Sequence, residues 1–359
     1  MDDTVPLYPL YVVLFAASGL TGGQISALFV IWSVTGLVTE IPTGALADRF
    51  SRRAALIAAG VLKAAGYALW TVLPGFAGFA AGFVLWGLSG SLVSGSLEAL
   101  VYEGLADAGV PQRYPTVVGR ITAVGLLAQV PSAVAATVLY ADGGFRLAGW
   151  VSVGCCLASS LLATRLPRPP RTTDDDDDDG YFATLRAGVR ETVKQPTVRI
   201  AVLALAAVGG IDALEEYFPL LGQSWSVPTG LIPLAVLGIP LAGAGGAAIA
   251  GRLAALRPNA LAGLLGGMAA LLAAAAVLHV AAGIALVAAG YALYRAVLVV
   301  VDTRCQERIT GTARATVTSV AAVGTELACF LVYGAWALGQ AFAVAVLIGL
   351  IAVAVSLLR

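Results

Sequence analysis

The sequence predicts an all-α membrane protein with twelve transmembrane helices in two six-helix halves. Of its 359 residues, 59% are hydrophobic and 12% are charged, whereas a soluble domain has about 25% charged residues. The apolar residues form runs of about 20, the length that spans a hydrocarbon core of ~30 Å. Basic residues gather in alternate loops between these runs. Together these features exclude a soluble enzyme, a disordered protein, a nucleic-acid-binding protein and a β-barrel.

Each predicted span is an apolar run that ends at a polar or glycine-rich break. In the first half, the runs occupy residues 7–20, 24–45, 54–73, 76–100, 116–140 and 147–165. In the second half, they occupy residues 197–220, 229–250, 259–279, 282–301, 315–335 and 337–358. The first run is short, and only a weak glycine signal around residues 334–339 separates the last two.

The basic residues predict the orientation of the chain. Eighteen of the 21 Lys and Arg residues follow even-numbered spans or end the chain, and only Arg146 lies in a loop on the opposite side. Because basic loops stay in the cytoplasm, both termini are predicted to be cytoplasmic. Lys is scarce and Ala, Gly and Arg are abundant, which suggests a GC-rich bacterial genome. We therefore predict a multi-pass protein of the bacterial cell (inner) membrane.

A polar segment divides the two halves. Residues 166–196 open with Pro167, Pro169 and Pro170 and include six consecutive carboxylates, Asp174 to Asp179, and such a block of like charge is typical of a solvated linker. Residues 181–194 are predicted to form an amphipathic helix on the membrane surface. The predicted domains are thus an N-terminal bundle (1–165), a cytoplasmic linker (166–196) and a C-terminal bundle (197–359).

The sequence predicts no metal site, cofactor or ATP-driven step. The four cysteines form no C-x-x-C pair, and a single histidine, His279, cannot build a metal site. The phosphate-binding pattern G-x-x-x-x-G-K-[ST] does not occur. The expected partners are a small-molecule substrate, protons and the lipid bilayer, with no nucleic acid, and the chain is expected to be a monomer.

A motif after the second span carries a family resemblance. The stretch GALADRFSRR, from Gly44 to Arg53, resembles the loop signature of the major facilitator superfamily. The stretches 94–103 and 314–319 are similar to the drug and metabolite exporters of that superfamily. The resemblance covers the whole chain and implies two six-helix halves that transport by alternating access, with a cytoplasmic clamp between Asp48 and the start of span eleven, near Arg314. The resemblance and the charge pattern suggest a cytoplasmic gate made of Glu40, Gly44, Asp48, Arg49, Arg52, Arg53, Glu98 and Arg314.

Three positions depart from the family pattern. Ser51 replaces the usual glycine of the loop signature, which predicts a slightly different loop shape. Trp86 stands where many proton-coupled members have an arginine in span four. Span five has Gly125 and Pro131 but not the usual antiporter spacing. These departures weaken the family's usual proton-relay scheme, although they leave transport itself intact.

Ionisable residues inside the second half are candidates for substrate and proton handling, because such residues are costly at membrane depth. On span seven, Asp212 and Glu216 are four residues apart and are predicted to share a helical face, and Glu215 is three residues from Asp212. On span ten, Tyr291 and Arg295 share a face. An estimate from helix rise places Arg295 about ten Å deeper than Asp212, which leaves a direct ion pair open. Interhelical polar packing is the alternative role for this set.

Further candidates are a carboxylate and several rings. Glu326 lies in the middle of span eleven, where burial would favour its neutral form and suit a reversible proton carrier. Tyr11, Trp86 and Tyr294 are candidate walls of a substrate cavity. Aromatic walls with few charges suit an apolar or amphipathic substrate.

The predicted function is transport of a small organic molecule by alternating access, with proton-coupled efflux and with Asp212 and Glu326 as the leading proton sites. An uncoupled facilitator or an importer of the same fold is the first alternative. A membrane-embedded enzyme or a sensor is a more distant alternative, because the chain has one histidine and no segment long enough for a signalling domain. The substrate cannot be identified from the sequence.

Overall fold

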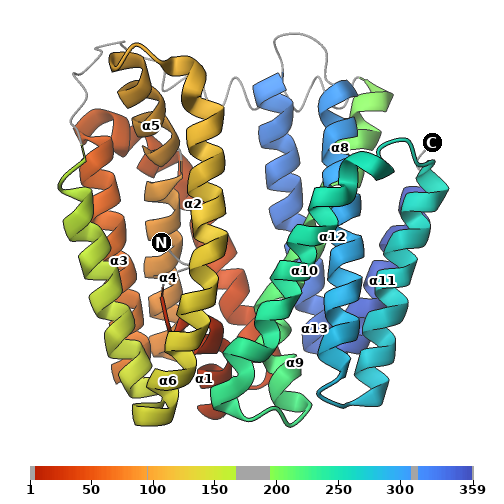
Figure 1. Ribbon diagram of the computed structural model, residues 1–359, viewed down its shortest axis with the longest axis horizontal. Helices are drawn as coiled ribbons and strands as arrows, with labels where there is room; N and C mark the ends of the chain where they lie inside the picture. The colour runs from red at the N-terminus through yellow and green to blue at the C-terminus, as the bar shows by residue number, and fades with distance from the viewer. Residues whose placement is uncertain (1–4, 95, 167–194, 309–313, 358–359) are drawn as a thin grey trace. The chain divides into compact units, whose positions relative to one another are not determined.

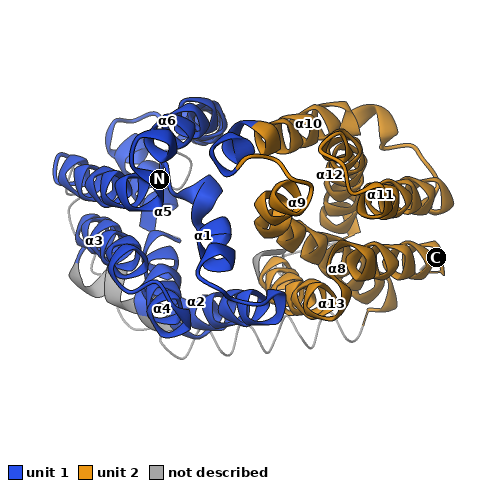
Figure 2. Cartoon of the chain, turned by 90° about the horizontal axis from the view of Figure 1, so that it is seen from below, with its two compact units in different colours: residues 1–175, 229–234 blue, residues 176–228, 235–359 orange. Residues whose placement is uncertain are grey.

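The computed structural model describes residues 5–94, 96–166, 195–308 and 314–357; side chains at 41–42, 44–50 and 314–316 are not described. The described residues are almost entirely helical and contain no β-strand (Figure 1). They fall into two compact units, residues 1–175 with 229–234 and residues 176–228 with 235–359 (Figure 2). The all-α prediction is therefore confirmed. The predicted linker falls mostly on residues 167–194, outside the described residues.

The first unit contains six α-helices, with short 3₁₀ turns beside them. They are η2 (Tyr8–Leu10), α1 (Tyr11–Ala17), α2 (Gly22–Phe50), α3 (Arg52–Val72), α4 (Phe76–Val93), α5 (Ser96–Asp107), η3 (Pro111–Arg113) and α6 (Tyr114–Ala163). Helix α3 packs on α4 and α6, and α2 packs on α4. The turn η5 (Thr229–Leu231) also belongs to this unit and packs on α6.

The second unit contains the remaining helices. They are α8 (Pro196–Gly209), η4 (Gly210–Tyr217), α9 (Phe218–Ser224), α10 (Ile232–Leu253), α11 (Pro258–Leu278), α12 (Gly283–Arg308) and α13 (Arg314–Leu357). Helix α8 packs on α12 and α13, η4 packs on α13, and α11 packs on α12 and α13. The first three residues of α10 are grouped with the first unit.

The described helices are consistent with the twelve predicted spans. Nine elements are long and apolar enough to cross a membrane, and a tenth apolar helix, Tyr8–Ala17, is shorter. Two of the nine are each two helices joined at a sharp turn, at Gly143–Gly144 in α6 and at Gly339–Gln340 in α13. Gly144 has φ 62°, a left-handed conformation that glycine adopts readily. The antiparallel legs of α6 and α13 are visible in Figure 1.

Local sequence explains where α2 and α3 begin. The backbone N–H of Thr21 donates to Gln24 Oε1 at 2.9 Å, and the N–H of Gln24 donates to Thr21 Oγ1 at 3.3 Å. This reciprocal pair is a capping box that satisfies two N–H groups at the start of α2. Ser51 separates α2 from α3 in an extended conformation (φ 173°), and its Oγ accepts a hydrogen bond from Ala54 N–H. Serine is therefore well suited to this position, since it caps α3 and no left-handed backbone is needed.

Aromatic side chains form the core of the first unit. Helix α1 has only seven residues, and its Tyr11 and Phe15 are buried against Trp70, Phe83 and Trp86. The Trp70 indole N–H donates to the backbone oxygen of Phe79 at 3.1 Å, so the polar edge of this buried ring is satisfied. The short first helix is thus held by ring packing inside its own unit.

Candidate functional site

The helix that carries the acidic candidates changes its winding in the middle. After α8, the eight residues of η4 form a 3₁₀ helix, and α9 then resumes α-helical winding. A 3₁₀ helix has three residues per turn, and runs this long are uncommon. Asp212, Glu215 and Phe218, each three residues apart, are therefore brought to one face.

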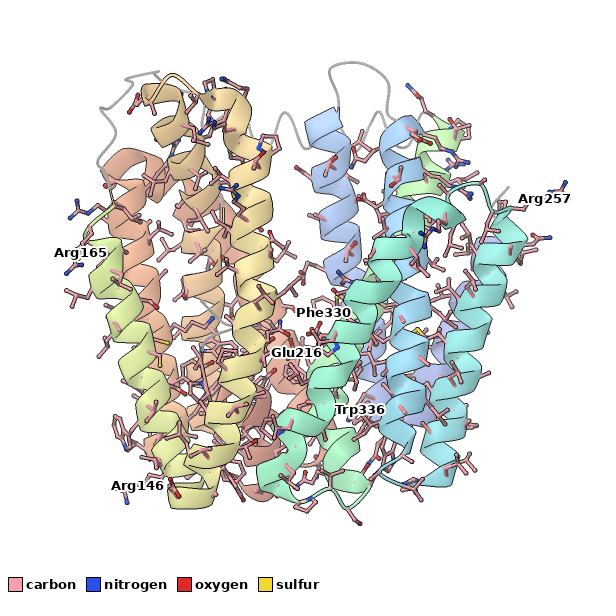
Figure 3. The ribbon with its side chains drawn as sticks, viewed as in Figure 1. Arg146, Arg165, Glu216, Arg257, Phe330 and Trp336 are labelled. Carbon is pink, nitrogen blue, oxygen red and sulfur yellow. The ribbon has the colours of Figure 1, made fainter. Side chains whose placement is uncertain are left out.

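This winding corrects one sequence prediction. An α-helix would align Asp212 with Glu216, but the observed three-residue turn aligns Asp212 with Glu215 instead. Glu216 lies near the middle of the second unit along the helix direction (Figure 3) and has partners of its own. The sequence signal that could have indicated the change is the Gly209-Gly210 pair at the junction of α8 and η4, since glycine weakens regular helix.

Two side chains of α12 contact the acidic face of η4. Arg295 Nη1 donates to both carboxylate oxygens of Asp212, at 3.1 and 3.3 Å. The Tyr291 hydroxyl lies 2.9 Å from Asp212 Oδ1 and 3.1 Å from Glu215 Oε2. Because Tyr291 and Arg295 are four residues apart on an α-helix, both project toward η4. We call Asp212, Glu215, Tyr291 and Arg295 the η4–α12 cluster.

The ion pair between Asp212 and Arg295, which the sequence left open, is therefore direct. The helix that carries Asp212 continues to Ser224, twelve residues beyond Asp212, and Arg295 lies twelve residues after the start of α12 at Gly283. The 3₁₀ segment also rises about 2.0 Å per residue instead of about 1.5 Å. The sequence estimate ended span seven at residue 220 and used the α-helical rise alone, so it placed Asp212 too close to the membrane surface.

The charged side chains of the η4–α12 cluster are partly exposed. The side chains of Arg295 and Asp212 are 34% and 42% exposed, although both lie far from the ends of their helices. The buried rings of Phe218 and Tyr291 meet edge to face at 5.2 Å beside them. The cluster thus combines partly exposed charged groups with packed aromatic rings beside them.

Glycines allow the neighbouring helices to approach the cluster. A Cβ atom at Gly243 of α10 would lie 2.7 Å from the Tyr291 ring and 3.0 Å from Arg295 Cγ. A Cβ atom at Gly210 would lie 2.5 Å from the Cβ of Ala328 on α13. These contacts fix the positions of α12 and η4, in agreement with the role of small residues between membrane helices.

Other candidates of the second unit lie close to the cluster. The Tyr294 hydroxyl donates to the backbone oxygen of Gly209 at 3.4 Å, where α8 passes into η4. Glu326, Asp212 and Glu216 all lie within electrostatic range of buried Cys329 on α13. Among the described residues, no group of three or more His, Cys, Asp or Glu side chains is placed to hold a metal ion.

Tyr11 and Trp86 lie in the aromatic core of the first unit. Their exposures are 2% and 4%, so both rings are packed by protein. The Lys63 ammonium lies 4.6 Å from the centroid of the Trp86 ring, a cation–π contact that compensates for burying this charge. Their role as walls of a substrate cavity stays a prediction.

The candidate gate residues are described only in part. Arg52 forms an ion pair with Glu103 of α5, which was not among the predicted gate residues. Arg53 Nη1 donates to the backbone oxygen of Leu166 at 3.1 Å, and Ser94 Oγ donates to Glu40 at 3.3 Å. Glu98 is exposed. The surroundings of Gly44 and the side chains of Asp48, Arg49 and Arg314 are not described, so the clamp stays a prediction.

We expect replacement of Glu103 by glutamine to lower stability by less than about 1 kcal/mol, because both partners are partly exposed and water competes for them. A thermal melt of the purified protein checks this result, with Glu98→Gln on the same helix as the control. A loss well above that of the control would show that the pair is shielded from water.

Comparisons with known proteins agree with this architecture. The family model of the Major Facilitator Superfamily matches residues 2–333. A crystal structure of a single-substitution variant of the nucleoside transporter NupG has a TM-score of 0.78 at 10% identity, and covers 99% of this chain and 94% of its own. That of the D-xylose-proton symporter has a TM-score of 0.68 at 15% identity, and covers 98% and 92%. No curated protein matched the sequence.

The two solved structures share the fold of this chain at identities too low to indicate a common substrate. The family model, by contrast, matches most of the sequence. The matched residues include helices of both units and all four residues of the η4–α12 cluster. The chain belongs to the major facilitator superfamily and is a membrane transporter, not an enzyme.

Proposed function

We propose that this transporter moves a small organic molecule across the membrane in exchange for protons, and that the η4–α12 cluster couples the two movements. The observation that carries the proposal is the hydrogen-bonded group of two carboxylates, one guanidinium and one phenol on η4 and α12. Ionisable groups at membrane depth are rare, and many of them mark proton or substrate pathways.

The charge balance of the cluster supports proton coupling. Arg295 can neutralise one carboxylate, and its Nη1 lies 3.1 Å from Asp212 Oδ1. If both Asp212 and Glu215 are ionised, the cluster has an excess negative charge, which is costly away from bulk water. Uptake of one proton removes that charge, and a substrate bound beside the cluster would change the balance between the two states.

The surroundings of the cluster support an amphipathic substrate. The buried rings of Phe218 and Tyr291 lie next to the charged groups and make the surroundings of the cluster apolar. Such a site suits a molecule with a ring or chain and a few hydrogen-bonding groups. We expect the protein to reside in a bacterial inner membrane as a monomer with both termini in the cytoplasm.

Efflux is our proposed direction, because the stretches 94–103 and 314–319 are similar to exporter sequences. Import is the second candidate, favoured by the departures in spans four and five. The fold similarity to a protein described as a D-xylose-proton symporter is also consistent with import. An exporter would exchange substrate for protons, whereas a symporter would move both in the same direction.

We expect substrate movement through the purified protein in proteoliposomes to move protons across the same membrane. Compounds that raise the melting temperature of the protein, found by screening nucleosides, sugars and lipophilic amines, provide the probes. With substrate and an internal pH dye, outward substrate movement by an exporter brings protons inward, whereas a symporter carries them out with the substrate. Substrate movement that leaves the internal pH unchanged and is unaffected by a pH gradient would contradict coupling and favour a facilitator.

A further inference from the structure

Tyr291 contacts more acceptors than its single proton can serve. Its hydroxyl oxygen lies 2.9 Å from Asp212 Oδ1 and 3.1 Å from Glu215 Oε2. A phenol carries one O–H, and an ionised carboxylate has no proton to donate. If both carboxylates were ionised, they would compete for one proton and the second contact would bring two oxygen lone pairs together. A proton on one of the two carboxyl groups removes this conflict, because each contact then has a donor of its own.

The position of Arg295 decides which carboxyl group this is. Its Nη1 lies 3.1 and 3.3 Å from the two oxygens of Asp212. A guanidinium keeps its charge in proteins, and it favours an ionised carboxylate as partner. Asp212 thus accepts hydrogen bonds from Arg295 and from Tyr291, and both donors stabilise its charged form.

We propose that Glu215 is the proton-bearing group of this transporter. Its carboxyl O–H donates to the Tyr291 oxygen, the Tyr291 O–H donates to Asp212, and Arg295 donates to Asp212. Each hydrogen bond then has one donor and one acceptor. When the proton leaves Glu215 for water, a second negative charge forms beside Asp212 while Arg295 stays paired. This assignment differs from the sequence prediction, which favoured Asp212 and Glu326.

The winding of η4 makes Glu215, not its neighbour, the partner of Tyr291. The three-residue turn places Glu215 on the face of Asp212, and Glu216 follows one residue later on another face. Other titratable or charged groups on or near η4 are Glu216 of η4, Tyr294 of α12, and Glu326 and Cys329 of α13. Glu216 and Glu326 therefore offer matched controls within the same unit.

The experiment is infrared difference spectroscopy of the purified protein during a pH step. The wild-type spectrum should contain a protonated-carboxyl band that disappears as the pH rises. We expect Glu215→Gln to lose that band, and Glu216→Gln and Glu326→Gln to keep it. Glutamine can donate to Tyr291 in place of the carboxyl group, so the variant should fold, which size-exclusion chromatography and a thermal melt check. Persistence of the full band in Glu215→Gln, or its loss in either control, would overturn the assignment.

The role of Glu215 in transport rests on the proposed proton coupling. A second measurement tests the Glu215 assignment and the coupling separately. In proteoliposomes, Glu215→Gln should keep exchange of labelled for unlabelled substrate but lose accumulation driven by a pH gradient. If wild-type and Glu215→Gln proteins both accumulate substrate in response to the gradient, the Glu215 assignment fails while coupling stands. If no gradient drives the wild-type protein but Glu215→Gln alone loses the band, coupling fails while the protonated Glu215 stands.

Discussion

Replacing Arg295 by glutamine is expected to reduce transport by roughly 30–100-fold, the equivalent of about 2–3 kcal/mol for lost hydrogen bonds to a charged group. The arginine donates to both oxygens of Asp212, and no other cation among the described side chains forms an ion pair with this residue. Without Arg295, Asp212 has to take up a proton or remain charged beside Glu215. Either change removes the difference between the two carboxyl groups on which coupling depends.

The measurement is initial substrate flux in proteoliposomes, with Arg308→Gln as the control. Arg308 is an exposed residue at the end of the same helix, so its loss removes one positive charge without touching the cluster. The fall in stability should be small, about 1 kcal/mol, because both members of the pair are partly exposed. The double variant Asp212→Asn with Arg295→Gln should recover stability but not transport. Equal flux in Arg295→Gln and Arg308→Gln would contradict the role of the cluster.

Replacing Gly246 by alanine is expected to destabilise the second unit by about 1–3 kcal/mol or more, the range for overpacked contacts. A Cβ atom at Gly246 would lie 2.0 Å from the backbone oxygen of Ala292 on α12. A backbone atom cannot rotate away as a flexible side chain can, so α10 and α12 would have to separate. Gly243, one turn earlier, packs closely against the Tyr291 ring and the aliphatic part of Arg295. Separation of α10 from α12 would therefore loosen the η4–α12 cluster as well.

The adjacent residue gives a matched control for this prediction. Gly245 is exposed, and a Cβ atom there meets no other atom within 4 Å. We expect Gly245→Ala to melt at or slightly above the wild-type temperature, because alanine favours helix over glycine. The two variants, each adding one methyl group, are compared by thermal melting in the same detergent. If both melt at the same temperature, α10 and α12 are not in close contact.

The sequence predicted the helices well because their signals are local. Apolar runs of about 20 residues and the breaks between them indicate spans without knowledge of their neighbours. The turns at Gly143–Gly144 and Gly339–Gln340 fall within a few residues of the predicted breaks. Serine is a common N-cap residue, so its residue type alone could have predicted that Ser51 caps α3. The family pattern predicted only that a glycine is missing at this position.

The sequence predicted which residues belong to the candidate site, but not which of them contact each other. Ionisable side chains are costly at membrane depth, and they are therefore expected to have a function or a partner. This expectation, together with the aromatic residues beside them, identified Asp212, Glu215, Tyr291 and Arg295. Their arrangement depended on an assumed α-helical period and rise. Both assumptions fail over the eight residues of η4, so the structure places Glu215 and not Glu216 on the face of Asp212. Glu103, the partner of Arg52, lies 51 residues away in the chain, and no local pattern pairs them.

The sequence by itself determined that this chain is an all-α membrane protein, with apolar runs that predict twelve spans, because hydrophobic length and loop charge are properties of each segment alone. It also predicted which few ionisable residues lie within the spans. Only the tertiary structure decided which of them meet. The 3₁₀ winding of η4 and the glycine contacts of α10 with α12 bring Asp212 and Glu215 together at Tyr291 and Arg295. These contacts arise from packing between segments that are distant in the sequence. The packing fixes the winding of η4 and the depth of each side chain to within a single residue.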